Sequence, residues 1–339
     1  MIHVPADTLR SLVTNIYIAL GTPDDIAHLV ADTLVEANLA GHDSHGVMRT
    51  PQYIAMIEKG NIQPAARPVV VDRRGARAIV DGGWGWGPPA AFLAAQTAAD
   101  LARDKGVGAV TARRTNHIGR VGAYAQAIAR DGQIGFILAN VGAAVTPFGG
   151  RQRLMGTNPI AWAVPRAAGH EPLVLDFATS VLAEGKVRVA KDKGVPVPPG
   201  VILDSHGQPS QNPNDFYDGG MLLPFGGYKG YGVSVMIELL GGALSGSGVS
   251  PSPKYGGGNG TLVLALNIAD FVDPAEFEAD VEDYVARLKA APTVDDVAEV
   301  LLPGEPEQIA RRQREVEGIP LPEVTWEDLQ AQARRLGVG

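Results

Sequence analysis

The residues most able to do chemistry lie close together near the N-terminus. Residues 41–53 read GHDSHGVMRTPQY and hold His45, Arg49 and Tyr53 at four-residue intervals. An imidazole can carry a proton near neutral pH, a guanidinium can bind a carboxylate through two hydrogen bonds, and a phenol can donate one. This combination suits a small carboxylic acid whose neighbouring carbon gains or loses a proton.

Two local structures would bring these three side chains together. In one helix that continues from Ser44, they would share a face. Pro51 opposes that helix, because it restricts the preceding residue and lacks a backbone N–H. Alternatively, Thr50 caps a new helix that has Pro51 at its first position and ends at Lys59. A purely structural interpretation also stays open, in which His45 is a loop residue and the tyrosine belongs to the core.

Elements at both ends of the chain are expected to position these residues. Hydrophobic periodicity predicts amphipathic helices over residues 5–20 and 23–40, directly ahead of the stretch just described. Near the C-terminus, charged helical turns are expected over residues 306–317 and 326–336. We expect these last helices to pack back on the N-terminal ones.

The middle of the chain alternates between helix and strand patterns. Such alternation predicts a sheet with helices packed on it, and the short turns between several strands favour a mixed sheet over a purely parallel one. Strands are expected at residues 68–71, 78–80, 107–111, 134–140, 160–164, 172–176 and 262–266, and helices at 89–105, 121–130, 231–244, 274–290 and 294–300. Residues 191–226, rich in proline and glycine, are expected to form a long ordered loop. We therefore predict an α/β domain over residues 75–304 and a helical domain made of residues 1–74 and 305–339.

The composition fits a chain with a large apolar core and excludes several functions. Of 339 residues, 45% are hydrophobic and 19% charged, which is enough to fold one or two domains. The net charge of −8 argues against nucleic acid or an anionic membrane as the partner. The absence of cysteine excludes disulfides and thiolate chemistry, and no histidine–carboxylate spacing indicates a metal. Since neither a signal peptide nor a membrane-spanning apolar run is visible, we expect a cytoplasmic protein.

Three further segments could bind a ligand. Asp176 ends an expected strand, and Thr179 and Ser180 would open the next helix, whose N-terminus suits a phosphate. Lys229 lies in a glycine-rich run and offers a point charge for a phosphate. His117 lies after a strand and before a helix, where α/β proteins often bind ligands. An N-cap, a tight loop and a structural histidine would explain the same residues without any ligand.

The common nucleotide-binding signatures are not cleanly present. No strand is followed by Gly-x-Gly-x-x-Gly with an acidic residue about twenty positions later, and no Gly-x-x-x-x-Gly-Lys-Ser/Thr loop occurs. Residues 82–88 are glycine-rich, but their tryptophans and proline fit poorly against a pyrophosphate. A dinucleotide would therefore have to bind in another way.

Taken together, these segments resemble the type 2 malate/L-lactate dehydrogenase family. That family also contains ureidoglycolate, L-sulfolactate and diketogulonate dehydrogenases or reductases and cyclic-imine carboxylate reductases. The matching motifs are DSHG (43–46) with Arg49 and Tyr53, NHIG (116–119), GTNPI (156–160), VLDFATS (174–180), LPFGGYKGYG (223–232) and LPGE (302–305). Each motif alone is weak, but jointly, in family order over nearly the full length, they are highly specific. Phe177, where the family often has methionine, leaves the substrate more open than the reaction type.

The resemblance implies a homodimeric, NAD(P)-dependent oxidoreductase with a cofactor domain (residues 75–304) that is not a Rossmann fold. The implied reaction is hydride transfer between nicotinamide and the α carbon of a small 2-hydroxy or 2-oxo carboxylic acid. It makes His45 the proton donor or acceptor, and Asp176 the carboxylate that orients it and raises its pKa. In some relatives the residue matching His117 is the base, so this role stays divided between the two histidines.

The resemblance also implies ligand contacts. The implied substrate-binding residues are Ser44, Arg49 as carboxylate clamp, Tyr53 and Thr157. The implied cofactor-binding residues are Asn140, Asp176, Phe177, Ala178, Thr179, Ser180, Lys229, Gly230, Pro303, Gly304 and Glu305. The sequence does not choose between NAD and NADP. Two alternatives stay open: a reductase of a cyclic imine carboxylate, and a catalytically silent relative that only binds a ligand.

Overall fold

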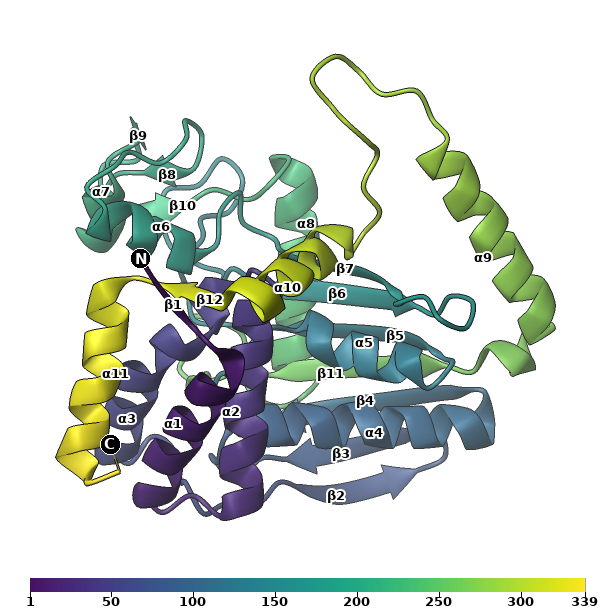
Figure 1. The fold of residues 1–339 in the computed structure, drawn as a ribbon, viewed down its shortest axis with the longest axis horizontal. Coiled ribbons are helices and arrows are strands. Elements are labelled where there is room, and N and C mark those ends of the chain that lie inside the picture. Colours follow the sequence, from purple (N-terminus) through teal and green to yellow (C-terminus); the bar gives the residue numbers. More distant parts are fainter. Residues whose placement is uncertain (339) are drawn as a thin grey trace.

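The two ends of the chain combine into one helical layer (Figure 1). The computed structural model describes residues 1–338, and Gly339, the last residue of the predicted helical domain, lies outside the described part. The helices of the layer are α1 (Ala6–Ala19), α2 (Asp24–Leu39), α3 (Thr50–Glu58), α10 (Glu305–Glu317) and α11 (Glu323–Leu336). As predicted, α11 packs on α1 and α10 on α2. The unpredicted strands β1 (Ile2–Val4) and β12 (Ile319–Leu321) also pair antiparallel and tie the two ends together.

A seven-stranded mixed sheet forms the centre of the molecule (Figure 1). In spatial order its strands are β2 (Val69–Arg74), β3 (Arg77–Asp81), β4 (Val107–Arg113), β11 (Thr261–Leu266), β5 (Ile134–Ala139), β6 (Pro159–Val164) and β7 (Leu173–Ala178). Strands β3 and β4 run parallel, and every other neighbouring pair in this sheet is antiparallel. The predicted mixed, non-Rossmann sheet is therefore confirmed, because a doubly wound sheet is mostly parallel.

Helices cover both faces of this sheet. On one face lie α4 (Gly87–Lys105) and α5 (Gly122–Arg130), and α4 is rich in alanine because it packs very close to β4. A Cβ on Gly108 of β4 would lie 1.9 Å from the Ala98 carbonyl oxygen. The other face carries α8 (Tyr228–Ile237) and the π-helix η3 (Glu238–Ala243). Neighbouring residues of β5 alternate accordingly: Ile137 joins the core under α4 and α5, and Leu138 packs with Ile237 of α8.

The apolar interior consists of separate clusters. The largest lies between the sheet and α4 and α5, and another lies within the helical layer. Trp86, which precedes α4 in sequence, belongs to the cluster of the helical layer. The division into two domains, with its boundaries, stays a prediction.

Three local predictions are wrong. The strand with Asp176 does not end there, because β7 stays paired with β6 as far as Ala178, and the next helix, α6 (Glu184–Asp192), begins well after Thr179. Residues 294–300 form no helix, and Asp296 adopts a left-handed backbone conformation with φ of 65°. The expected loop at 191–226 contains regular elements too short to leave a periodic pattern. They are β8 (Ile202–Leu203), β9 (Pro209–Ser210), α7 (Pro213–Tyr217) and β10 (Met221–Leu222).

An arm extends away from the sheet between β11 and α10 (Figure 1). It consists of a 3₁₀ turn, η4 (Ile268–Asp270), the helix α9 (Pro274–Lys289) and an irregular return segment. Val285 is the buried residue of α9, so most of this helix faces outward.

The loop after α2 is held by side chains rather than by regular structure. It consists of two 3₁₀ turns, η1 (Asp43–His45) and η2 (Val47–Arg49). Asn38 donates a hydrogen bond of 2.7 Å to Asp43 and accepts one of 2.9 Å from the Val47 N–H. Arg314 of α10 binds both carboxylate oxygens of Asp43, at 2.6 and 3.0 Å. Gly46 leaves room for the side chain of Asn38, because a Cβ there would lie 2.2 Å from the Asn38 Oδ1.

We expect Arg314→Ala to lower the free energy of unfolding by about 2 kcal/mol, because it removes charge-assisted hydrogen bonds from a partly buried carboxylate. Arg312→Ala is the matched control, since this neighbouring arginine is exposed. Urea unfolding followed by circular dichroism measures both variants. Equal losses in the two variants would contradict the assigned role of Arg314.

Candidate active site

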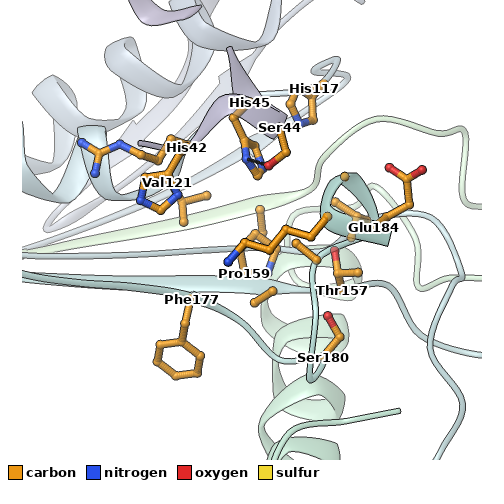
Figure 2. A pocket seen from close by; sticks show the side chains of 18 of the residues that line it. His42, Ser44, His45, His117, Val121, Thr157, Pro159, Phe177, Ser180 and Glu184 are labelled. Carbon is orange, nitrogen blue, oxygen red and sulfur yellow. Dashed lines mark hydrogen bonds between the residues drawn. The ribbon is translucent and has the colours of Figure 1, made fainter. Parts of the chain in front are cut away.

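A cavity of about 450 Å³ lies where the helical layer meets the sheet (Figure 2). Its walls come from the loop after α2, the segment after β4, the start of β6 and the chain from β7 into α6. Among the predicted site residues, it is lined by Ser44, His45, Arg49, His117, Thr157, Asp176, Phe177, Ala178 and Ser180. Residues far apart in the sequence thus meet around one space.

The backbone around His45 is closer to the second of the two predicted structures, although the capping role expected of Thr50 is wrong, because Thr50 is itself helical and Arg49 takes the N-cap position. A new helix, α3, begins at Thr50 with Pro51 in its first turn, so no single helix connects His45 to Tyr53. Arg49 still stays beside the histidine, because its Nε donates a 2.6 Å hydrogen bond to the carbonyl oxygen of Ser44. The Ser44 Oγ lies 3.1 Å from His45 Nδ1. Ser44 therefore ties the imidazole and the guanidinium into one unit.

The guanidinium of Arg49 keeps capacity for a ligand. Its Nη1 donates to Gln52 at 2.9 Å, and its Nη2 lies 3.8 Å from a carboxylate oxygen of Glu184, too far for a strong hydrogen bond. Glu184 belongs to α6 and lines the same cavity. A carboxylate that entered the cavity could take the place of this loose contact.

His117 lies beside His45 in the wall of the cavity (Figure 2). The two rings are stacked, with centroids 5.7 Å apart and an angle of 19° between their planes. His117 Nδ1 lies 2.6 Å from the hydroxyl of Tyr53. Tyr53 itself is 2% exposed and does not line the cavity, so it lies behind His117.

Burial keeps both histidines neutral in the folded chain. It lowers the pKa of His45 to about 3, with further lowering from the positive charges of Arg49, His42 and Arg120. Burial likewise lowers the pKa of His117 well below its usual value, assisted by Arg49 and His45. The expectation of a raised His45 pKa is therefore wrong, because burial and the nearby cations disfavour the imidazolium and no carboxylate is hydrogen-bonded to the ring.

Asp176 lines the cavity without touching His45 through a hydrogen bond. Its Oδ2 accepts a 2.8 Å bond from the backbone N–H of Gly122, at the start of α5. Burial raises the pKa of Asp176, and the charges of Arg120 and His42 oppose that rise. The orienting role predicted for this carboxylate stays a prediction.

Some of the predicted cofactor residues line the cavity and the others do not. Asp176, Phe177, Ala178 and Ser180 line the cavity. Asn140 and Thr179 are buried and hydrogen-bonded inside the protein, to Glu238 and to the backbone of Thr157 and Asn158 respectively.

The remaining predicted cofactor residues lie outside the main cavity. Lys229 is exposed in the first turn of α8, and Gly230 is buried against Phe225. Pro303, Gly304 and Glu305 lie at the start of α10, where Glu305 binds Lys289 at 2.9 Å. Gly304 lines a second cavity of about 390 Å³.

Arg120 is a site residue that the sequence analysis missed. It lines both cavities and is 8% exposed. Within residues 1–338, its guanidinium makes one hydrogen bond, of 3.3 Å to Gln126, and no ion pair with an acidic side chain. A buried cation without a direct ion pair favours binding of an anion. The available signal was its position, directly after the NHIG motif.

A cluster of metal-ligating side chains and a membrane-spanning helix are both absent from the described residues. No group of three His, Asp or Glu side chains in residues 1–338 could hold a metal ion. No helix in the same range is long and apolar enough to cross a membrane.

Stability should fall in acid because of the buried histidines. The folded His45 stays neutral down to about pH 3, whereas an unfolded histidine takes up a proton below about pH 6.5. Its contribution is thus complete above pH 6.5 and is lost as the pH falls towards 3. We expect His45→Gln to reduce by about 1.4 kcal/mol the stability difference between pH 7.5 and pH 5.5. Urea unfolding at the two pH values measures this, and an unchanged difference would contradict burial of a neutral ring.

Comparison with known proteins agrees with the resemblance found in the sequence, over nearly the whole chain. A family model described as malate/L-lactate dehydrogenase matches residues 4–330. Hydroxycarboxylate dehydrogenase B of Escherichia coli (strain K12) is 37% identical over 342 residues, which cover 98% of this chain and 94% of that protein.

Solved structures give the same result. Malate dehydrogenase from Pyrococcus horikoshii OT3 superimposes with a TM-score of 0.91 at 32% identity, covering 100% of this chain and 96% of that one. Δ1-piperideine-2-carboxylate reductase from Pseudomonas syringae has a TM-score of 0.86 at 33% identity, with 98% and 100% covered. The chain therefore belongs to the malate/L-lactate dehydrogenase family and is an oxidoreductase that acts on the CH–OH group of a hydroxy acid.

Proposed function

We propose that this protein transfers a hydride between NAD(P) and the α carbon of a small 2-hydroxy or 2-oxo carboxylic acid, with His45 as the proton donor or acceptor. The observation that carries the proposal is the joint placement of His45 and Arg49 in one cavity, both bonded to Ser44. Arg49 would bind the carboxylate of the acid, which brings the neighbouring oxygen close to the imidazole.

The charges around His45 support proton exchange by His45 and carboxylate binding by Arg49. A neutral His45 is ready to accept the proton of a hydroxyl group, as oxidation of a hydroxy acid requires. After burial, the charge of Arg49 is the main influence that lowers the pKa of His45. A substrate carboxylate on Arg49 would offset that charge and so make the imidazolium easier to form. Proton uptake by His45 would thereby be coupled to the presence of the acid.

The residues around the cavity fit a dinucleotide. A nicotinamide bound there would supply or accept the hydride. Residues 176–180 would hold that half of the cofactor, and the buried guanidinium of Arg120 would bind a phosphate. Because Arg120 also lines the second cavity, the other half of the cofactor would reach Gly304. Both NAD and NADP remain compatible with this arrangement.

We also propose a homodimer. Trp162 and Leu175 are directly paired across β6 and β7 and are 49% and 44% exposed. The arm adds Phe271 and Tyr284, each 62% exposed. Neighbouring large apolar side chains at the surface favour a contact between subunits.

A cyclic-imine reductase is the second candidate. It is supported by the similarity to the piperideine-carboxylate reductase, since a cyclic imine acid also carries a carboxylate next to the reacting carbon. A silent ligand-binding relative is less well supported, because His45, Arg49 and Asp176 are all present around one cavity.

A substrate panel tests the proposed function. Purified protein is mixed with NADH or NADPH and with pyruvate, oxaloacetate or Δ1-piperideine-2-carboxylate, and the loss of absorbance of the reduced cofactor is followed. We expect turnover of at least one 2-oxo acid, and a loss of about 10³-fold in kcat for His45→Gln, because the proton carrier is removed. Turnover of the imine alone would select the second candidate, and no turnover at all would favour the silent relative.

Arg120→Met should weaken cofactor binding at least about tenfold, because it removes one charged contact to a phosphate. Titration of the protein with NADH and NADPH, followed by nucleotide fluorescence, measures the dissociation constant without any turnover. Arg130→Met is the matched control, since Arg130 lines the second cavity but is half exposed and paired with Glu171 at 2.8 Å. A raised KM for the acid with unchanged nucleotide affinity would contradict a phosphate contact.

A further inference from the structure

The two histidines of the cavity each use one ring nitrogen inside the protein, but their partners differ. His45 Nδ1 faces the Ser44 hydroxyl at 3.1 Å, and His117 Nδ1 faces the Tyr53 hydroxyl at 2.6 Å. In the described part of the chain, neither Nε2 atom has a hydrogen-bond partner. Both rings line the cavity, so the Nε2 atoms are the ones left for a substrate (Figure 2).

The hydroxyl of Tyr53 has a single hydrogen-bond acceptor within residues 1–338. The residue is buried and packs edge-on against Trp86, with ring centroids 5.7 Å apart. Burial raises the pKa of Tyr53 to about 12, so the phenol stays protonated. His117 Nδ1 is its hydrogen-bond partner within residues 1–338, and a buried O–H group uses the acceptor that it has. A neutral ring that accepts at Nδ1 carries its own proton on Nε2.

We propose that Tyr53 locks His117 in the tautomer with the proton on Nε2, which makes His117 a fixed hydrogen-bond donor to the substrate oxygen and leaves proton exchange to His45. This inference rests on the proposed function and deepens it, because it separates the roles of the two histidines. Tyr53 is then a positioning residue that acts through His117.

The Ser44 hydroxyl leaves the position of the ring proton of His45 free, whereas the Tyr53 hydroxyl fixes that of His117. A serine hydroxyl can accept from Nδ1–H or donate to a bare Nδ1 by rotating. When Nδ1–H donates to Ser44, the Nε2 lone pair is free to take a proton. In oxidation of a hydroxy acid, the substrate O–H bond breaks and its proton moves to His45 Nε2. The α C–H bond would break with its electron pair, a bound oxidised nicotinamide would accept the hydride, and the C=O bond would form while His117 keeps its proton.

The tautomer itself can be measured without any substrate. In protein labelled with ¹⁵N-histidine, the ring nitrogens give separate signals for protonated and unprotonated atoms, and loss of a set in His117→Gln assigns that residue. We expect His117 to show a protonated Nε2 and an unprotonated Nδ1, and Tyr53→Phe to replace this pattern by an average of both tautomers. A proton on Nδ1 of the wild-type His117 would overturn the proposal. The outcome of this measurement does not depend on the outcome of the substrate panel, so the two proposals can fail separately.

Matched substitutions test the roles in turnover. A glutamine amide can reproduce the hydrogen bond donated from Nε2 but cannot exchange a proton. An asparagine is too short to place a donor at the position of Nε2. We expect His117→Gln to lose less than about tenfold in kcat and His117→Asn about 10²-fold, against about 10³-fold for His45→Gln. Equal losses for glutamine at positions 45 and 117 would overturn the proposal.

A double-mutant cycle separates positioning from packing. Tyr53→Phe should lower kcat about fivefold in the wild-type background and have no further effect in His117→Gln, because an amide has no tautomer to fix. A packing role for the hydroxyl would instead lower kcat by the same factor in both backgrounds. That second outcome would overturn the role of Tyr53 while leaving the proposed function intact.

Discussion

Asp43 is bound from two directions, by Asn38 of α2 and by Arg314 of α10, and this shared contact sets the course of the loop that carries His45. The loop has only 3₁₀ turns of its own, so its backbone has few internal hydrogen bonds. Its shape is imposed by long-range polar contacts between helices that are far apart in the sequence. From this one loop, Ser44 then fixes both the imidazole and the guanidinium of Arg49.

The cavity is more positive than the protein around it. The chain carries a net charge of −8, yet Arg49 and Arg120 both line the cavity. Two neutral histidines line the same cavity, and burial raises the pKa of Asp176, which also lines it. Such a balance favours anionic ligands and disfavours cations. Together with burial, the positive charges also explain why the imidazole of His45 resists protonation.

Much of the fold could be predicted from local sequence, because α1 and α2 repeat their apolar residues regularly, α4 is a long alanine-rich run and β5 is an unbroken apolar one. The end of β7 could not be predicted, since it is set by pairing with β6 rather than by Asp176 or Thr179. The elements of two residues in the segment 191–226 leave no periodic signal at all.

The candidate site was predictable in its residue types and only partly in its contacts. The motif around His45 placed Arg49 in the same cavity, because short sequence separation limits how far the two can diverge. The contact between Tyr53 and His117 joins an α-helix to a loop after a strand, so no local pattern encodes it. The same holds for Arg120, which lies in a cavity lined by residues of α2, α5, β7 and α10.

The dependence of the loop on Arg314 has a consequence for biosynthesis. Residue 314 is translated after every strand of the central sheet, the last of which ends at Leu266. The sheet can therefore assemble first, while the loop lacks the guanidinium that binds Asp43 until residue 314 has been translated. The loop that carries His45 thus reaches its final form after the sheet, and a product that ended between Leu266 and Arg314 would contain every strand of the sheet without the contact that orders this loop.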